Sequence, residues 1–298
     1  MASLRDIRTR ITGVTNTSKI TSAMKMVSAA KLKRAQDATE SARPYAIKMN
    51  KVLSNLVSAI GESYSHELIS QSEDIKSIAL IIIGSDKGLC GSFNNAMFKF
   101  IKNLITKDLA VKHPNAKFSI VTVGKKPTQH FKRLDYNTVS KFPDIFTKLK
   151  FETAIDIVDS VKTGFIEGKY DKVYTVYNRF VNVITSVPTI HQLLPIEANS
   201  IDSNSEKKSK IATDYIFEPN QKLIMDELLP KLLNISIWSF LLESNAAEQA
   251  SRMMAMDAAT NNANELLDSL KIVYNRERQA AITTEMLEIV GGANALEN

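Results

Sequence analysis

The chain has 298 residues, of which 44% are hydrophobic and 23% are charged, a composition typical of a globular protein with one or two domains. Its longest strongly apolar run, Ile78 to Ile83, is far shorter than the roughly 20 apolar residues that a membrane-spanning helix needs, so any membrane contact is expected to be indirect. The single cysteine, Cys90, excludes a disulfide within one chain and favours a reducing compartment.

The formal net charge of +6 generally favours binding to nucleic acid or to an anionic membrane. The charges are unevenly distributed, however. Residues 1–51 contain eleven Lys and Arg against three Asp and Glu, a net charge of +8, and residues 241–298 contain four against nine, a net charge of −5. The two ends of the chain are therefore electrostatically complementary, which favours their pairing.

The N-terminal segment, residues 1–60, is predicted to be one helix of a coiled coil. Seam residues at alternating spacings of four and three are first Ile7, Ile11, Val14, Ser18 and Thr21 and then, after a slip of three residues to Met24 and Ser28, Lys31, Ala35, Ala38, Ala42, Tyr45, Met49, Val52 and Leu56. Such a slip locally overwinds a coiled coil. Pro44 is expected to kink or break the helix near Arg43.

The same basic, acid-poor composition is also typical of a mitochondrial transit peptide. The periodic pattern begins directly after Met1 and continues past the length of a cleavable segment, which favours a coiled-coil helix instead.

Residues 75–196 are predicted to form a separate α/β domain. Apolar strands are expected at 78–83, 118–123 and 172–178, and helices at about 94–105 and 151–164. Strands that alternate with helices favour a parallel, Rossmann-like sheet. The segment 187–196, with its two prolines, is expected to be a strand end or an extended connector.

The loop from Gly84 to Gly91 follows the first strand and could in principle cradle a phosphate. Its spacing is G-x-x-x-G-x-x-G, which matches neither a P-loop nor a dinucleotide-binding turn. A structural turn or a subunit contact is therefore preferred for its residues Asp86, Lys87, Gly88, Cys90 and Gly91. The four histidines are scattered without the spacing of a metal site, and no metal or cofactor is predicted.

The C-terminal segment, residues 220–298, is predicted to be a second long helix, preceded by an exposed loop or connector at 197–219. From Lys231 to Val290 it contains neither Gly nor Pro, so an unbroken helix would be roughly 90 Å long. Such a helix needs a partner, because most helical stability comes from packing an apolar face. The expected partner is the N-terminal helix in antiparallel orientation, against a seam at Met256, Ala259, Ala263, Leu266, Leu270 and Val273.

Beyond Val273 the apolar residues surround the helix instead of following one face. They include Ile282, Met286, Leu287, Ile289 and Val290, and a polar collar of Arg276, Arg278 and Gln279 precedes them. Because a helix end that is apolar on all sides is unfavourable in water, a second partner is expected to enclose it.

Four blocks of sequence match motifs of a known family. They are Lys19 to Val27, the loop Ser85-Asp-Lys-Gly-Leu-Cys-Gly91, the stretch Arg252 to Ala263, and Ile282-Thr-Thr-Glu-Met-Leu-Glu-Ile-Val-Gly-Gly-Ala293. At these residues the chain closely resembles the gamma-subunit family of F-type ATP synthases. The blocks extend from one end of the chain to the other, so the resemblance covers nearly the whole sequence.

The resemblance implies a non-catalytic rotor subunit that couples rotation of a proton-driven membrane ring to conformational changes in a catalytic head. The expected partners are alpha and beta subunits in the head, the c-subunit ring in the membrane and an epsilon-type small subunit. By position, Met24 and Lys25 would face the moving lever of a beta subunit. The catch loops of the head would contact Arg276, Arg278, Gln279, Thr283 and Glu285, and the ring side of the α/β foot would include Tyr215, Phe217 and Glu218.

The residue patterns alone leave two alternatives: a basic coiled-coil protein that binds nucleic acid, and a nucleotide-binding α/β enzyme built on the Gly84 to Gly91 loop. The resemblance implies neither nucleic-acid binding nor catalysis. It implies a peripheral location, preferably at the cytoplasmic face of a bacterial plasma membrane, with the matrix side of the mitochondrial inner membrane as the alternative.

Overall fold

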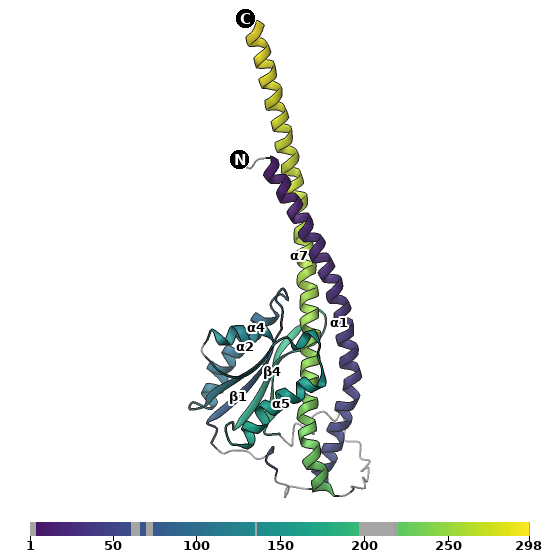
Figure 1. Ribbon diagram of the computed structural model, residues 1–298, viewed down its shortest axis with the longest axis vertical. Coiled ribbons are helices and arrows are strands. Elements are labelled where there is room, and N and C mark those ends of the chain that lie inside the picture. Colours follow the sequence, from purple (N-terminus) through teal and green to yellow (C-terminus); the bar gives the residue numbers. More distant parts are fainter. Residues whose placement is uncertain are drawn as a thin grey trace. The chain divides into compact units, whose positions relative to one another are not determined.

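The structure, a computed structural model, describes residues 4–60, 66–69, 74–134, 136–196, 218 and 220–297. Two long helices, α1 (Leu4–Ile60) and α7 (Gln221–Glu297), flank an α/β region in the sequence. This region contains, in chain order, β1 (Ser77–Ile83), α2 (Phe93–Asn103), the π-helix η1 (Leu104–Leu109), α3 (Ala110–Lys112), β2 (Lys117–Val123), α4 (Lys125–Lys132), β3 (Asn137–Phe142), the 3-10 helix η2 (Ile145–Thr147), α5 (Phe151–Ile166), β4 (Lys172–Phe180) and β5 (Ser186–Leu194) (Figure 1).

The chain divides into two compact units. The helix-pair unit contains the residues up to Ala29 and those from Arg252 onward, and the sheet unit contains Ala30–Ser251. Each unit takes one part of α1 and one part of α7, and the sheet unit also contains every strand.

The sheet has five strands in the order β3-β2-β1-β4-β5. β1 to β4 are parallel, and β5 pairs antiparallel with β4 at one edge. The predicted α/β fold is confirmed, but the sequence analysis missed α4 and β3. The segment 187–196, expected to be a strand end or a connector, contains all but the first residue of strand β5, in which Pro188 is tolerated because an edge strand has one side without ladder hydrogen bonds.

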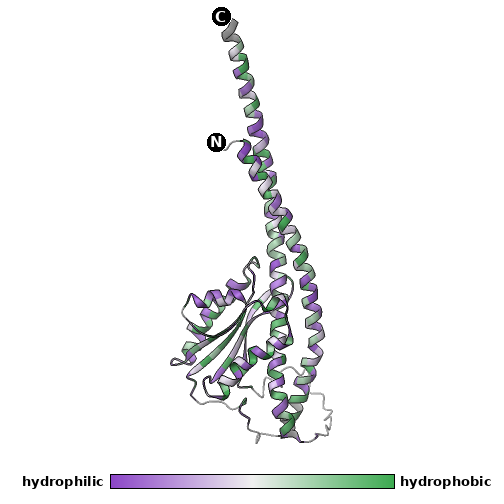
Figure 2. Ribbon diagram, viewed as in Figure 1, coloured by the Kyte–Doolittle hydropathy of each residue, from purple (hydrophilic) through white to green (hydrophobic). Residues whose placement is uncertain are grey.

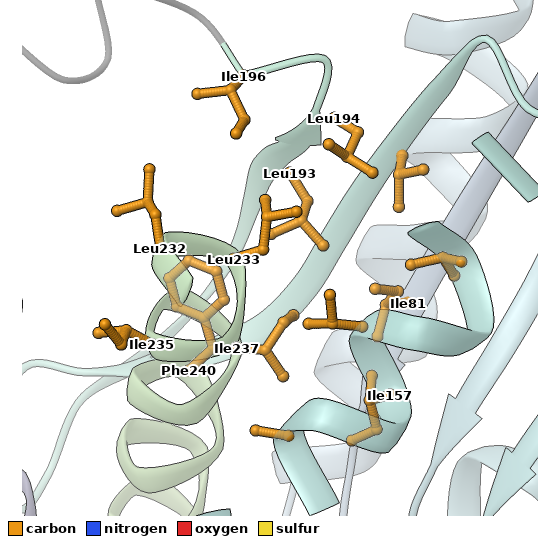
Figure 3. Packing of buried hydrophobic residues seen from close by; sticks show 14 of the residues in the cluster. Ile81, Ile157, Leu193, Leu194, Ile196, Leu232, Leu233, Ile235, Ile237 and Phe240 are labelled. Atoms are coloured by element: carbon orange, nitrogen blue, oxygen red, sulfur yellow. The ribbon is translucent and has the colours of Figure 1, made fainter. Parts of the chain in front are cut away.

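The central strand β1 is buried on both faces of the sheet, as its continuous apolar run predicts. Ile81 belongs to a core shared with α1, α5 and α7, whereas Leu80 belongs to a second core formed with α2 and α4. In Figure 3 the side chains of Leu233 and Ile237 on α7 gather with Ile81 and other residues of the sheet and α5. The sheet therefore lies between two helical layers, and one of them includes both long helices.

Within the sheet unit, α1 contributes Leu53 and Leu56, both 0% exposed, to the core that contains Met225 of α7. Buried or half-buried residues of α1 in this unit recur at positions 32, 35, 39, 42, 46, 49, 53 and 56, with spacings of three and four, and Gln36, Asn50 and Val52 beside them are also half-buried. Five of the eight seam residues predicted here are therefore buried or half-buried: Ala35, Ala42, Met49, Val52 and Leu56. The predicted seam residues Lys31, Ala38 and Tyr45 are exposed, because the buried stripe passes one residue later at each of these turns.

In the helix-pair unit, three polar contacts join α1 to α7. They are Ser18 Oγ to Asn264 Oδ1 at 2.8 Å, Thr21 Oγ1 to Thr260 Oγ1 at 2.7 Å, and Lys25 Nζ to Asp257 Oδ1 at 2.6 Å. Residue numbers rise along α1 as they fall along α7, so the predicted antiparallel orientation is confirmed.

The predicted slip in the α1 seam is wrong. The spacing of four and three continues from Thr21 through Lys25 to Ser28, so Lys25 takes the seam position that the sequence analysis gave to Met24. Asp257 makes this possible, because it supplies a partner for the charged side chain. On α7 the seam includes Leu267 (9% exposed), whereas Leu266 is 41% exposed.

The two prolines do not end the long helices. α1 is continuous with Pro44 inside it, and α7 begins at Gln221, close to the predicted start at residue 220, so Pro230 lies well inside that helix. Pro44 is exposed, so water can solvate the carbonyl group that lacks its helical partner. The expected break near Arg43 is not present.

Candidate functional site

The loop after β1 is held in place by the carboxylate of Asp86, which is 8% exposed. Its Oδ1 accepts hydrogen bonds from the backbone N–H groups of Lys125 (3.0 Å) and Asp144 (2.8 Å), and its Oδ2 accepts one from Phe146 (3.0 Å). The first of these donors begins α4 and the other two lie at the start of η2. One acidic side chain thus ties together three segments that are far apart in the sequence.

A second network fixes the rest of this loop. Asn94 Nδ2 donates to Ser85 Oγ at 2.7 Å, and Ser85 Oγ donates to the carbonyl oxygen of Lys87 at 2.8 Å. Leu89 has a φ of 61°, which is unfavourable for a leucine, and its side chain is 66% exposed. Lys87 is exposed and Gly88 is half-buried, whereas Cys90 is 2% exposed.

The close approach of two turns explains a glycine at position 124. Gly124 has a φ of 101°, and a Cβ atom there would lie 2.8 Å from the carbonyl oxygen of Gly84. The turns after β1 and β2 therefore contact each other through their backbones.

In open α/β sheets, ligands bind at the carboxyl ends of the strands where the strand order reverses. Here that position lies between β1 and β4, and side chains of the same chain fill it. Cys90, Phe93 and Ala247 of α7 form a buried cluster there, with Phe180 packed against it. Asn178 Nδ2 also donates to the carbonyl oxygen of Phe93 at 3.2 Å. The arrangement is a joint between the sheet and α7, which argues against a nucleotide site built on the loop.

A buried polar group that the sequence analysis missed lies beside this joint. Tyr177 is 5% exposed and stacks on Phe240, with ring centroids 4.4 Å apart. Burial, followed by the neighbouring Glu243 carboxylate, raises the pKa of the Tyr177 hydroxyl far above its ordinary value. Burial also raises the pKa of Glu243, although Arg179 and Arg43 oppose this shift. No motif marks these residues, because they come from three separate segments.

The two candidate contact residues on α1 have different environments. Lys25 is 45% exposed at its side chain and pairs with Asp257, which is 36% exposed. Met24 is half-buried beside it. The ion pair leaves Lys25 partly accessible from outside the helix pair.

The C-terminal part of α7 has a different surface from the rest of the helix. Every residue from Arg278 to Ala293 is exposed, including Gln279, Thr283 and Glu285. Figure 2 shows hydrophobic and hydrophilic residues alternating along this part. The large exposed hydrophobic side chains are Ile282 (50%), Met286 (64%), Leu287 (68%), Ile289 (68%) and Val290 (56%).

The polar collar is not held in place by other segments among the described residues. Arg276 is 75% exposed at its side chain, and its Nη2 donates to Glu277 Oε1 at 3.3 Å. Thr283 Oγ1 donates to the carbonyl oxygen of Gln279 at 3.0 Å. These contacts are local to the helix, so the outward-facing side chains are available to a partner. The structure therefore groups the five candidate head contacts on α7 along one exposed segment.

The candidate ring contacts can be placed only in part. Glu218 is exposed, whereas Tyr215 and Phe217 lie outside the described residues, as does the remainder of the expected loop at 197–219.

Within the described parts of the chain, no helix is both long enough and apolar enough to cross a membrane. The same residues contain no group of three or more His, Cys, Asp or Glu side chains arranged to hold a metal ion.

Comparisons with known proteins agree on one group of relatives. A family model described as ATP synthase matches residues 3–296. The chain is 46% identical to the ATP synthase gamma chain of Chloroherpeton thalassium over 302 residues, which cover 100% of this chain and 99% of that relative. It is 43% identical to the ATP synthase gamma chain of Chlorobium limicola over 298 residues, with 100% of both chains covered.

Solved structures show the same similarity. The central stalk of the Tetrahymena thermophila mitochondrial ATP synthase has a chain that is 30% identical, with a TM-score of 0.59 over 80% of this chain and 99% of that chain. A chain of the Euglena gracilis mitochondrial ATP synthase has a TM-score of 0.68 over 98% of this chain and 94% of that chain. At 19% identity, the second match supports the fold alone.

Proposed function

Because the chain belongs to the ATP synthase gamma-chain family, we propose that its exposed α7 end turns inside the catalytic head of an F-type ATP synthase. The chain is a non-catalytic subunit of the central stalk. The observation that carries the proposal is the exposure of every residue from 278 to 293, five of them large and hydrophobic. Several large apolar side chains exposed on one short segment are typical of a protein interface.

The mechanism depends on contacts that differ between otherwise identical sites. An asymmetric shaft inside a ring of similar subunits touches each of them differently, so each angle of rotation favours a different open or closed state. To change a site from mostly open to mostly closed takes about 5.5 kcal/mol of differential contact energy. A few apolar and charged contacts per subunit can supply that amount.

The filled joint between β1 and β4 supports a role without catalysis. Cys90, Phe93 and Ala247 occupy the place where a doubly wound sheet would hold a ligand. The α/β region therefore acts as a rigid body attached to α7, and it can transmit torque from the ring to the helix.

Individual contacts are assigned by position. Alpha and beta subunits surround the α7 end, and the catch loops of the head contact the collar and the residues just beyond it, which are Arg276, Arg278, Gln279, Thr283 and Glu285. The lever of a beta subunit contacts Met24 and Lys25. The partial exposure of Lys25 despite its ion pair with Asp257 supports this last assignment.

The α/β region, residues 75–196, is the foot in this proposal. Tyr215, Phe217 and Glu218, from the segment that follows it in the sequence, dock toward the ring, and the foot binds the c-subunit ring and an epsilon-type small subunit. The protein would then be peripheral to a membrane, at the cytoplasmic face of a bacterial plasma membrane or on the matrix side of the mitochondrial inner membrane.

Reconstitution is the direct test. The full chain is mixed with alpha and beta subunits from the same source, and assembly and ATP hydrolysis are measured with and without it. We expect the chain to complete the head and to raise hydrolysis. If it changes neither, the rotor function is contradicted.

The collar has a matched test. Arg276→Ala with Arg278→Ala removes two exposed arginines, and Lys148→Ala with Lys150→Ala removes two exposed lysines of the foot as the control. We expect only the first pair to lower ATP hydrolysis by the reconstituted head. Equal effects of the two pairs would contradict a specific contact at the collar.

The lever contact is tested by Met24→Lys, with Met26→Lys as the control because Met26 is 67% exposed on the same helix. A cation beside Lys25 should reduce ATP-driven proton pumping more than it reduces assembly. Equal pumping by the two variants would count against the contact at Met24.

A further inference from the structure

The helical layer formed by α2, η1, α3 and α4 is strongly basic. Residues 93–142 contain ten Lys and Arg against two Asp, and neither α2 nor α4 contains an acidic residue. The two helices are neighbours, because the rings of Phe98 and His130 stack with centroids 4.0 Å apart. Like charges on adjacent helices repel one another, so this layer carries an electrostatic cost that an anionic partner would relieve.

Four of these basic residues lie at the end of the sheet where its parallel strands begin. Lys112 ends α3 and Lys117 begins β2, while Lys132 ends α4 and Arg133 follows it, shortly before β3. Because parallel strands begin at a common edge, these helix ends and strand starts are close together. We call this set the basic edge: Lys112, Lys117, Lys132 and Arg133, with the neighbouring Val111 and Leu134.

Two described acidic residues near the basic edge, Asp171 and Asp74, have other partners. Asp171 Oδ2 accepts hydrogen bonds from the backbone N–H groups of Lys76 and Ser77, each at 2.8 Å. Asp74 lies 3.9 Å from the Lys76 ammonium group. Within the described residues, none of the four cations of the basic edge forms an ion pair. The positive potential also reaches His113, whose pKa is lowered by burial and then by Lys172 and Lys112.

Apolar side chains lie among these cations. Val111 is 73% exposed beside Lys112, and Leu134 is 53% exposed beside Arg133. Exposed apolar residues flanked by cations are typical of surfaces that bind the headgroup region of anionic membranes. Two exposed apolar side chains among cations are too few for the apolar core of a stable protein interface, but they suit shallow insertion into a headgroup layer, which favours a lipid surface.

The basic edge lies at the end of the sheet unit where α7 begins. β5 ends at this edge, and two residues after the strand the N–H of Ile196 donates to the carbonyl oxygen of Leu68 at 2.9 Å. Leu68 and Ile196 share a core with Met225 in the first turns of α7. This is the end that the proposed function turns toward the membrane ring.

From this charge, exposure and position we propose that the basic edge contacts anionic phospholipid headgroups beside the membrane ring. The orientation rests on the proposed function, whereas the affinity for lipid is a property of the chain itself. The contact is a weak electrostatic one, which would allow the foot to slide over the membrane surface as the rotor turns.

Vesicle co-sedimentation tests the proposal. The full chain is mixed with vesicles of phosphatidylcholine alone or of phosphatidylcholine with phosphatidylglycerol. The test variant carries Lys112→Gln, Lys117→Gln and Lys132→Gln. The control carries Lys126→Gln, Lys148→Gln and Lys150→Gln, which remove the same charge near the opposite edge of the sheet. Thermal unfolding of each variant verifies that it is folded.

We expect the wild type to bind the anionic vesicles, and the test variant to bind about fivefold more weakly for each lysine removed. The control should change less than about twofold, because its lysines lie beyond a Debye length from the bound surface. The proposal is overturned if the wild type binds both kinds of vesicle equally or neither, or if the two triple variants weaken equally.

A fluorescent label locates the contact independently of affinity. Leu134→Cys at the basic edge and Ile184→Cys at the turn between β4 and β5 each carry an environment-sensitive dye, and Cys90 is buried and should not react. We expect the emission to shift on addition of anionic vesicles only at position 134. An equal or larger shift at position 184 would overturn the location. Because no alpha or beta subunit is present, failure here is distinct from failure of the proposed function.

Discussion

Two regions of the same helix have similar apolar composition and opposite environments. Ile237 and Leu241 in the first half of α7 are 0% exposed, whereas Leu287 and Ile289 near its end are each 68% exposed. The first half is covered by the sheet, α5 and α1, and the end is covered by no described segment. The comparison shows that an apolar helix stabilises the fold only where the chain itself supplies the covering surface, and elsewhere serves a partner.

The largest expected effect concerns a side chain in the buried first half of α7. Ile237→Ala leaves a cavity in the larger core and should lower the free energy of unfolding by about 2–5 kcal/mol. Leu287→Ala removes a similar side chain from the exposed end and should change it by less than about 0.5 kcal/mol. Urea unfolding of the isolated chain measures both. Similar losses in the two variants would mean that the α7 end is also part of the folded core.

The next largest effect concerns the loop after β1, which supports the buried first half of α7. Asp86→Asn replaces a carboxylate that accepts three backbone hydrogen bonds. The NH2 group of the asparagine cannot accept a hydrogen bond, so at least one of the three N–H donors would lose its acceptor. We expect a loss of about 1–3 kcal/mol in urea unfolding. Asp108→Asn, on the exposed side of η1, is the matched control. An Asp86 variant as stable as this control would show that the three contacts contribute little.

A pH profile tests the buried region of α7 through Glu243. The pKa of Glu243 is raised above its ordinary value of 4.5, so the folded chain retains a proton that the unfolded chain has released. The resulting stabilisation is complete below pH 4.5 and is lost as the pH rises through the folded-state pKa. Glu243→Gln should therefore flatten the fall of stability in this window, as measured by urea unfolding at a series of pH values. An unchanged profile in Glu243→Gln would exclude this source of pH dependence.

The smallest expected effect concerns an ion pair between α1 and the part of α7 that lies, along the helix, between its buried first half and its exposed end. Lys25 and Asp257 form an ion pair with partly exposed side chains. A double-mutant cycle with Lys25→Met and Asp257→Leu should give a coupling energy below about 1 kcal/mol, and added salt should reduce it. A much larger coupling energy that does not depend on salt would mean that the pair is effectively buried.

Local patterns in the sequence predicted the elements that depend on local composition. The continuous apolar run of β1 and the uninterrupted length of α7 need no distant partner to be recognised. α4 was missed because Lys125, Lys126 and Pro127 look like a turn, although proline is tolerated in the first turn of a helix. β5 was missed because its proline seemed to exclude a full strand, although an edge strand tolerates one.

Contacts between distant residues could not be predicted in this way. Lys25 occupies a seam position only because Asp257, 232 residues away, lies opposite. Asp86 could be selected as a loop residue, but the three N–H groups that it binds are 39, 58 and 60 residues further along the chain. The exposed candidates on the α7 end were predicted by the family resemblance and by the absence of a single apolar face, and the structure groups them on one segment.

The continuity of α7 affects how its exposed end can be ordered. A separate helix of that size would be marginal in water, because the first turn fixes several residues for a single hydrogen bond. Here the paired residues from Arg252 onward already form the nucleus, and the same hydrogen-bond ladder continues to Glu297. Each further turn therefore needs only the favourable propagation step. A surrounding head could thus order the end turn by turn as it assembles, without having to nucleate a helix.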